Sequence, residues 1–347
     1  MNFLTKYLAS KSGKFICDAP FSQVYIYPDG RVYLCPDCYL TPSAAIGNLN
    51  KNSFDEIWNS VTAQFIRREA LRGIYHYCST TYCLSDTNFH AKTIPDKNIK
   101  YTCIQKKYPK MVCIGADSEC NAACIMCRKE LSRMSDEELK ESNSKIEKLY
   151  IPILKDAEFL TLSTTADPFG SRNTRLLLKT AANTYPKLKF NILTNGILCD
   201  EFNCKELGIE NRLNKIMFSI HASNRNTYND IVKNGNWDKV CKNIEWAEEQ
   251  RDKNKINTLY LAFVVSSKNY YDIPDFIEFA KNHKIKALFW LCRDWGDNLS
   301  NSGEQLEVWD MRHPKFSEYC NIINNIDFNN EFAAFSPEIM NIKRRRI

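Results

Sequence analysis

The chain has 347 residues, 44% of them hydrophobic and 25% charged, which is the composition of an ordinary globular protein with room for two domains or one large barrel. Its formal net charge of +6 is mild for this size and gives no reason to expect sequence-specific nucleic-acid binding. A run of about 18 apolar residues and the apolar core of a signal peptide are both missing, so we expect a cytoplasmic protein that does not enter a membrane.

Residues 1–98 are interpreted as a small module in which cysteines accompany a hairpin and a helix. Two β-rich runs around a Pro-Asp-Gly turn predict a hairpin over 24–35. Ser53, with Glu56 three residues later, predicts a capping box that opens a helix over 53–72. We expect the apolar residues at helical spacing in the core: Phe54, Ile57, Trp58, Val61, Phe65 and Ile66. Clustered cysteines in a reducing compartment indicate metal binding more often than disulfides, and those of the module are Cys17, Cys35, Cys38, Cys78 and Cys83.

Cys120, Cys124 and Cys127 follow with the spacing C-x3-C-x2-C. Three thiolates on one loop favour a soft metal or cluster. A [4Fe–4S] cluster is usually held by four cysteines, so three would leave one iron open for a ligand that is not protein. Zinc is the alternative, and it would require a fourth Cys or His, which does not closely follow Cys127.

Strands and helices alternate from residue 111 onward. Apolar β-rich runs occur at 111–116, 158–163, 188–194, 215–220, 258–265 and 286–292. Helical stretches lie between them at 136–149, 171–184, 200–207, 238–251 and 273–283. This alternation predicts an α/β fold with a parallel sheet, a partial (β/α)6 TIM-like barrel whose chemistry sits at the carboxyl ends of the strands. Residues 297–347 predict a helical cap and a basic tail.

Further site candidates stand at the expected strand ends. Ala166-Asp167-Pro168 follows the second strand, and Asn195 follows the third. Ser219 and His221 alternate with apolar residues on the fourth strand, so we expect them on one face, where polar groups inside a barrel need polar partners. Cys292 ends the sixth strand on the side where a substrate would bind. Structural roles are the alternative for His221 and Cys292.

The cysteine loop resembles the signature of the radical S-adenosylmethionine (radical SAM) superfamily, with Met126 where that family usually has an aromatic residue. The resemblance implies that S-adenosylmethionine binds the open iron of a [4Fe–4S] cluster. Reductive cleavage then gives a 5′-deoxyadenosyl radical, which abstracts hydrogen from a substrate. The strand-end segments resemble the family's Gly-Asp-Pro, Thr-Asn-Gly and Ser-Ile-x-Ala motifs. This implies a set of cofactor-binding residues: Ala166, Asp167, Asn195, Ser219 and His221.

The N-terminal module resembles the SPASM and twitch domains that carry auxiliary clusters in many radical SAM enzymes, although the better-known members carry them after the radical motif. The segments that match are Cys17, Gly30-x4-Cys35, Ile46-Gly-Asn-Leu, Glu56-Ile-Trp-Asn, Cys78 and Cys83. The shorter twitch form, with one cluster, fits the number of cysteines better. The resemblance implies an auxiliary [4Fe–4S] cluster held by Cys17, Cys35, Cys78 and Cys83, with Cys38 in reserve. A zinc ribbon with the same four thiolates is the alternative.

We therefore expect three parts: an auxiliary-cluster domain at 1–98, a radical SAM barrel at 99–296 and a cap at 297–347. The expected reaction is oxidation or epimerisation of a carbohydrate-like or cyclitol-like substrate, because no separate leader-peptide-binding domain is seen. In an epimerase, the Cys292 thiol would return the hydrogen atom. Modification of a peptide or protein side chain is one alternative, and a zinc-stabilised binding protein without catalysis is another. The expected partners are a small-molecule or peptide substrate and a reductant such as flavodoxin or ferredoxin.

Overall fold

The computed structural model describes residues 16–36, 42–78, 92–93, 102–162, 166–293 and 305–344. Cys38 and Cys83 lie outside the described residues. The chain divides into two compact units, and each is considered by itself below. The first unit comprises 1–117, 136–165 and 176–189, and the second comprises 118–135, 166–175 and 190–347.

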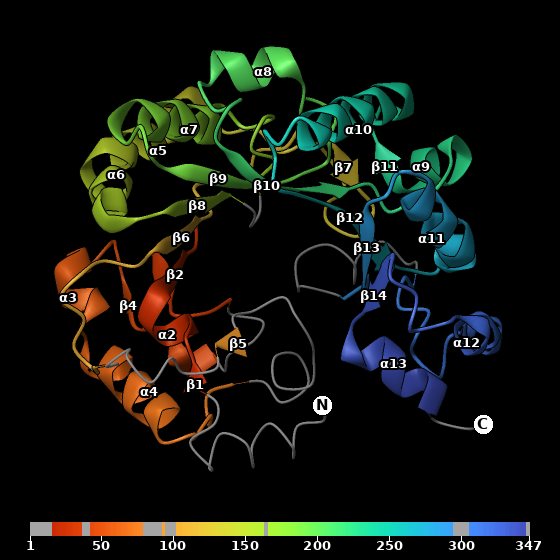
Figure 1. The fold of residues 1–347 in the computed structure, drawn as a ribbon, viewed down its shortest axis with the longest axis horizontal. Helices are drawn as coiled ribbons and strands as arrows, with labels where there is room; N and C mark the ends of the chain where they lie inside the picture. The colour runs from red at the N-terminus through yellow and green to blue at the C-terminus, as the bar shows by residue number, and fades with distance from the viewer. Residues whose placement is uncertain are drawn as a thin grey trace. The chain divides into compact units, whose positions relative to one another are not determined.

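The first unit contains a mixed sheet whose strands are β2 (Gln23–Ile26), β3 (Arg31–Tyr33), β4 (Gly47–Asn48), β6 (Met111–Ile114) and β8 (Phe159–Leu162). They follow the order β8-β6-β2-β3-β4 (Figure 1). Strands β8, β6 and β2 are parallel neighbours, and β3 and β4 continue the sheet antiparallel. The expected hairpin is confirmed, with Gly30 at φ +84° in its turn, a conformation that glycine adopts without strain. The hairpin does not form a sheet of its own, because β2 pairs with β6.

A break in the expected helix over 53–72 corrects the sequence prediction. The capping box of Ser53 and Glu56 is present, but α3 (Phe54–Trp58) ends early and α4 (Val61–Leu71) starts anew. The Ser60 hydroxyl accepts a hydrogen bond from the N–H of Ala63 and caps α4. The new start changes the helix phase, so Val61 is 85% exposed and Phe65 40% exposed, whereas the other predicted core residues are buried.

The remaining described elements of the first unit are short or irregular. They are β1 (Ile16–Cys17), α2 (Ala19–Ser22), the 3-10 turn η2 (Pro42–Ala44), β5 (Lys92–Thr93), α5 (Asp136–Lys145), the π-helix η3 (Ile146–Tyr150), α6 (Ile151–Ile153) and the 3-10 turn η4 (Leu154–Asp156). Strands β1 and β5 form a separate antiparallel pair. Helix α7 (Arg172–Thr184) begins in the second unit and continues in the first.

The second unit contains a fully parallel sheet whose strands are β9 (Lys189–Thr194), β10 (Leu213–Ser219), β12 (Thr258–Val265), β13 (Lys286–Leu291) and β14 (Ala333–Phe335). Its helices are α8 (Glu201–Glu206), α9 (Arg225–Ile231), α10 (Trp237–Asp252), α11 (Ile273–Asn282), α12 (Phe316–Asn325) and α13 (Pro337–Arg344), with a 3-10 turn η5 (Tyr270–Asp272). A two-stranded antiparallel ribbon of β7 (Ala123–Cys124) and β11 (Val232–Lys233) completes it. Figure 1 shows α9, α10 and α11 on the same side of the parallel sheet.

The α/β class and the mostly parallel sheet that the sequence predicted are confirmed. All six predicted strands are present within a residue or two of their expected ends. The elements that the sequence analysis did not predict include the short helix α9 and β14, which adds a strand to the sheet in a region expected to be helical. Strand β14 has only three residues, too few to show a strand period.

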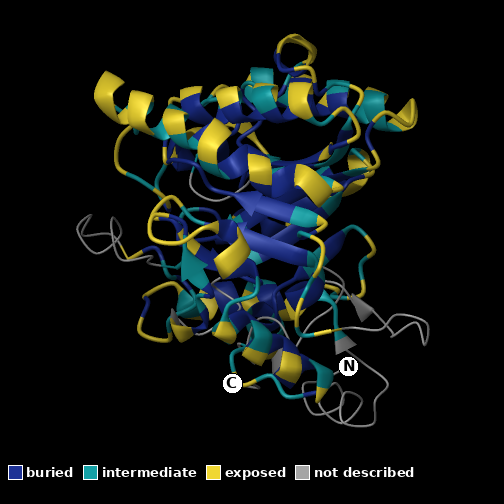
Figure 2. Cartoon of the chain, turned by 90° about the vertical axis from the view of Figure 1, so that its left-hand side faces the viewer, coloured by how far each residue is buried: buried dark blue, intermediate teal, exposed yellow. Residues whose placement is uncertain are grey.

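The two faces of the parallel sheet in the second unit differ. One face packs against helices through buried aromatic residues, such as Phe263 against Phe276 of α11 with ring centroids 4.7 Å apart. The opposite face carries a cluster of Met217, Ala262 and Leu288, edged by partly buried side chains that include Tyr260 and Trp290. Figure 2 shows strands as mainly buried and the outer sides of many helices as exposed. In the part of the chain that the structure describes, the helices are too short or too polar to cross a membrane.

Candidate iron–sulfur sites

One buried carboxylate joins the two ends of the cysteine loop. Glu119, directly before Cys120, is 2% exposed. Its carboxylate accepts hydrogen bonds from the N–H of Met134 at 2.9 Å and from the N–H of Arg172 at 3.0 Å. It also accepts one from the Arg172 guanidinium at 2.7 Å, and that guanidinium donates to the Met134 carbonyl as well. The two ends of the loop and the first turn of α7 are therefore held together at Glu119.

Backbone hydrogen bonds shape the loop between these ends. The carbonyl of Cys124 accepts from the N–H groups of Cys127 at 2.8 Å and Arg128 at 2.9 Å, which forms a tight turn. Strand β7 pairs with β11, so that Cys124 stands opposite Val232. The sequence spacing therefore becomes one folded turn that carries all three thiols.

Two thiols of this loop, those of Cys120 and Cys124, are held in the neutral form by their surroundings. Burial raises the pKa of Cys120, and it raises the pKa of Cys124 to about 12, with the neighbouring thiols Cys127 and Cys120 adding to the second shift. A bound metal reverses this preference, because metal ligation requires the thiolate and releases its proton. Cys120, Cys124 and Cys127 are thus neighbouring sulfur donors on one loop, the donor type that the predicted cluster needs, although the described His, Cys, Asp and Glu side chains form no group of three that could hold a single metal ion.

Two strand-end segments that the sequence singled out meet beside this loop. The Asn195 side chain donates to the Cys120 sulfur at 3.6 Å and to the Asn121 side-chain oxygen at 2.9 Å. The Asp167 carboxylate accepts from the Thr194 hydroxyl at 2.7 Å and from the N–H of Asn195 at 2.8 Å. The loop after β9 thus contacts the cysteine loop and is itself held by Asp167.

The Asp167 carboxylate is already engaged on both oxygens. Its second oxygen accepts from the N–H groups of Phe169 and Gly170, both at 3.0 Å. Burial raises its pKa, while these hydrogen bonds act in the opposite direction. Ala166, which stands where the resembling family has glycine, does not adopt a positive φ, so the substitution is tolerated. Gly170 is required, because a Cβ there would lie 2.3 Å from the Asn121 oxygen. Asp167 therefore organises two loops next to the thiols, and a direct contact with a cofactor stays a prediction.

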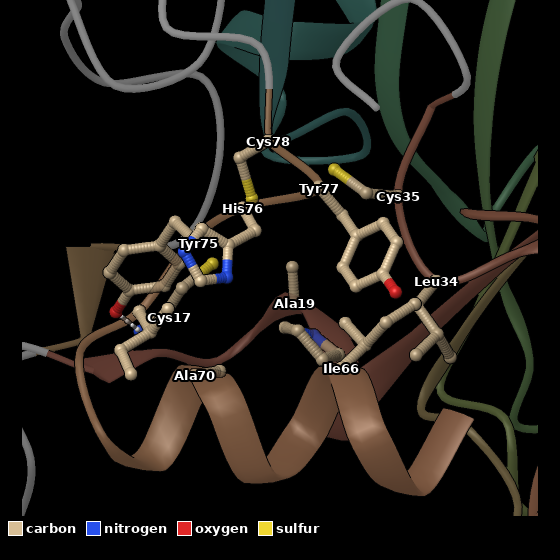
Figure 3. A pocket seen from close by; sticks show the side chains of 12 residues that line it. Cys17, Ala19, Leu34, Cys35, Ile66, Ala70, Tyr75, His76, Tyr77 and Cys78 are labelled. Carbon is tan, nitrogen blue, oxygen red and sulfur yellow. Dashed lines mark hydrogen bonds between the residues drawn. The ribbon is translucent and has the colours of Figure 1, made fainter. Parts of the chain in front are cut away.

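A small pocket lies in the first unit, and Cys17, Cys35 and Cys78 line it. Figure 3 shows the three sulfur atoms directed toward the same space, with Ala19, Ile66, Ala70 and Leu34 forming an apolar floor. Helix α4 supplies Ile66 and Ala70. Three of the four predicted auxiliary ligands therefore share one pocket, whereas Cys83 and its substitute candidate Cys38 lie outside the described residues.

Two of these cysteines form hydrogen bonds, one through its main chain and one through its sulfur. The N–H of Cys17 donates to the Tyr75 hydroxyl at 3.3 Å. The buried side chain of Gln23 places its amide nitrogen 4.0 Å from the Cys35 sulfur, within reach of a weak N–H···S hydrogen bond. The pocket thus has a mainly apolar lining, and one buried amide lies within reach of a cysteine sulfur.

Comparison with known proteins supports the same conclusion. Residues 17–83 match the SPASM family, described as an iron–sulfur cluster-binding domain. The matched segment lies ahead of the Cys120–Cys127 motif in the chain. A curated relative, the GTP 3′,8-cyclase of Desulforamulus reducens, is 26% identical over 192 residues, which cover 51% of this chain and 53% of the relative. The chain therefore spans about half the length of the curated relative that it matches.

Solved structures give a weaker likeness. Streptococcus suis SuiB bound to S-adenosylmethionine is 15% identical with a TM-score of 0.43, covering 66% of this chain and 50% of that one. The anSMEcpe structure with bound AdoMet is 19% identical with a TM-score of 0.42, covering 65% and 62%. The match at residues 17–83 supports the iron–sulfur site that the sequence predicted in this part of the chain, and S-adenosylmethionine as a cofactor stays a prediction.

The fourth predicted strand departs from expectation at His221. Strand β10 ends at Ser219, and His221 adopts φ +58°, so the alternation that would place both side chains on one face is broken. The imidazole Nδ1 instead accepts a hydrogen bond from the N–H of Val264 at 3.1 Å, and the His221 carbonyl accepts from Asn269 at 2.9 Å. Burial lowers the pKa of His221 to about 4, which keeps the ring neutral as an acceptor must be. His221 thus joins two strand ends, and its predicted contact with the cofactor is not tested.

Cys292 is completely buried just beyond β13. Its N–H donates to the Val265 carbonyl and its own carbonyl accepts from the Trp309 indole, both at 2.8 Å. Cys292 follows the last residue of β13, Leu291, and therefore lies next to Trp290 in the chain at the carboxyl end of this strand. Its burial also suits the structural alternative, and its role stays a prediction.

The sequence analysis missed three residues that contact the motif loop or flank its cysteines: Glu119, Arg128 and Arg172. Glu119 and Arg128 directly flank the motif, at positions where a charged residue is ordinarily a solvated one. Their position next to the cysteines was the feature of the sequence that could have indicated a role. No such feature marks Arg172, because it lies 53 residues from Glu119.

Proposed function

We propose that this protein reductively cleaves S-adenosylmethionine and uses the resulting radical to abstract hydrogen from a substrate. The observation that carries the proposal is the contact of Asn195 with Cys120, which joins two segments predicted independently to serve one cofactor. Cys120, Cys124 and Cys127 would each ligate one iron, leaving the fourth for the cofactor.

Each residue around the cluster would have a distinct task. When bound at such a cluster, S-adenosylmethionine supplies a 5′-deoxyadenosyl radical. Glu119 and Arg172 would keep the cysteine turn closed during reduction, and Asp167 would hold the loop that presents Asn195. The half-buried Ser219, at the carboxyl end of β10, would donate or accept a hydrogen bond to the cofactor.

In the N-terminal domain, Cys17, Cys35, Cys78 and Cys83 would hold a single auxiliary cluster. Such a cluster would accept an electron from the product radical or position the substrate. A flavodoxin or ferredoxin would supply the first electron. The division into parts at 1–98, 99–296 and 297–347 belongs to the same proposal, although β2 shares its sheet with β6.

For the substrate, we propose a carbohydrate-like or cyclitol-like alcohol that is oxidised or epimerised. Support comes from Ser219, Tyr260 and Trp290, which are half-buried in the second unit and combine aromatic rings with hydroxyl and N–H groups. A peptide or protein side chain is the second candidate, since one of the weakly similar structures carries a bound peptide.

The deciding experiment replaces all three motif cysteines with alanine. The wild type, reconstituted anaerobically with iron and sulfide, should bind about eight irons per chain and form 5′-deoxyadenosine with dithionite. The triple variant should lose about four irons and all cofactor cleavage, because no open iron remains. Undiminished 5′-deoxyadenosine would refute the proposal. Tight stoichiometric zinc without a brown cluster would support the non-catalytic binding protein instead.

A further inference from the structure

Arg128 directly follows the last motif cysteine and ties the ends of the cysteine turn together. Its guanidinium donates to the Cys127 sulfur at 3.6 Å and to the Ser118 carbonyl at 2.5 Å. Ser118 and Cys127 bracket the segment that carries all three thiols. The side chain is half-buried, whereas Lys129 beside it is exposed. A partly desolvated cation therefore lies against a sulfur that is predicted to ligate iron.

A second N–H donor contacts the turn at another cysteine. Asn195 donates to the Cys120 sulfur, also at 3.6 Å. The two donors differ in charge: Asn195 is neutral and comes from the loop after β9, whereas Arg128 carries a full positive charge. Two of the three thiols are thus hydrogen-bonded, and one of these bonds is charge-assisted.

The positive charge of Arg128 bears on how easily a cluster at the motif cysteines would be reduced. The potential of an iron–sulfur cluster depends on its net charge, on hydrogen bonds to its sulfurs and on exposure to solvent. A cluster with three thiolate ligands becomes more negative when it accepts an electron. A cation in contact with a ligating sulfur stabilises this reduced state more than the oxidised state.

We propose that Arg128 raises the reduction potential of the motif cluster by compensating negative charge at Cys127. This inference rests on the proposed function, because it requires a cluster at Cys120, Cys124 and Cys127. It assigns Arg128 a positioning and tuning role and no contact with the substrate. Reduction by a physiological donor would then depend on a residue outside the ligand set.

The test compares R128M and R128K with the wild type in the iron-loaded full-length chain. Each midpoint potential is measured by a redox titration followed by electron paramagnetic resonance. The signal that changes when S-adenosylmethionine is added belongs to the cluster with the open iron, which separates it from the auxiliary cluster. R128M should shift the potential of that cluster in the negative direction, by about tenfold in the reduction equilibrium, or ~59 mV for one electron. R128K keeps the positive charge but loses the planar guanidinium group with its several N–H donors, so the shift in its potential should be smaller than that of R128M.

K129M is the matched control, since it removes a cation one residue further along the chain from an exposed site. Its potential should equal that of the wild type. Equal potentials in R128M and wild type, with equal iron content, would overturn the inference and leave the proposed function standing. If R128M does not retain iron, R128Q decides, because it removes the charge but keeps a polar N–H donor, and an unshifted potential there would also overturn the inference. A wild type that takes up no cluster on the motif cysteines would instead refute the proposed function.

Discussion

The Glu119 carboxylate accepts both the main-chain N–H and the guanidinium of Arg172, a residue 53 positions further along the chain. The Glu119 side chain is 2% exposed and that of Arg172 is 39% exposed, so the pair is buried on one side only. Burial alone would raise the pKa of Glu119, but the hydrogen bonds from Arg172 and Met134 hold it below its ordinary value. The Glu119 carboxylate is therefore charged at neutral pH and holds the two ends of the cysteine loop together.

The first prediction is that Arg172→Ala loosens the turn. The variant leaves a buried carboxylate without its cation, which should lower the unfolding free energy by about 1–3 kcal/mol, reduced from the fully buried case because Arg172 is partly exposed. Iron should also leave the motif cluster faster during dialysis against a chelator. Arg225→Ala, which breaks the exposed pair with Asp238, is the matched control and should leave stability close to that of the wild type, because water screens an exposed pair. Equal iron loss in the two variants would contradict the assigned role of Arg172.

A second prediction concerns the pocket of the N-terminal domain. Changing Cys17, Cys35, Cys78 or Cys83 to alanine should remove about four irons per chain, yet uncoupled cleavage of S-adenosylmethionine should remain measurable. Substrate turnover should fall, because the auxiliary cluster is no longer there to take an electron or hold the substrate. Cys103→Ala, a half-buried cysteine outside the pocket, should keep its full iron content. Iron content unchanged in Cys35→Ala would indicate Cys38 as the ligand, or zinc in place of the cluster.

The third prediction separates epimerisation from oxidation at Cys292. If the thiol returns a hydrogen atom, Cys292→Ala should still cleave the cofactor but divert the substrate radical to other products. If the reaction is an oxidation, turnover should stay largely intact. The reaction in deuterium oxide distinguishes these cases, because a thiol exchanges with solvent and would deliver deuterium to the product. Cys320→Ala, another buried cysteine of the second unit, should leave the isotope pattern unchanged. An oxidised product without solvent deuterium would remove Cys292 from the mechanism.

The fourth prediction is a pH dependence that originates at His221. Its folded pKa, about 4, lies below the ordinary value of 6.5 because burial disfavours the charged ring. Between these values the unfolded chain binds a proton that the folded chain does not, so stability falls as pH drops from 6.5 toward 4. The shift corresponds to at most about 3 kcal/mol. His221→Gln cannot titrate, and thermal unfolding of both proteins at pH 5 and pH 7 should show a smaller pH effect in the variant. An identical pH effect would mean that another group is responsible.

Local and periodic patterns of the sequence were enough for most of the fold. The alternation of apolar strands with amphipathic helices determined the parallel class, because side-chain periodicity follows directly from strand and helix geometry. The spacing of Cys120, Cys124 and Cys127 determined that the thiols share one turn, since so few residues cannot separate them. The capping box at Ser53 was also readable, because its hydrogen bonds span only three residues.

Contacts between distant segments decided the rest. The Asn59 side chain accepts from the N–H of Gln105 and donates to its carbonyl, 46 residues away, and this pairing accompanies the break between α3 and α4 that exposes Val61. His221 left the strand because its ring could satisfy the N–H of Val264, a partner that no local pattern contains. Arg172 reached Glu119 in the same way. A buried hydrogen-bonding group must find a partner, and which partner it finds depends on the folded chain and not on sequence spacing.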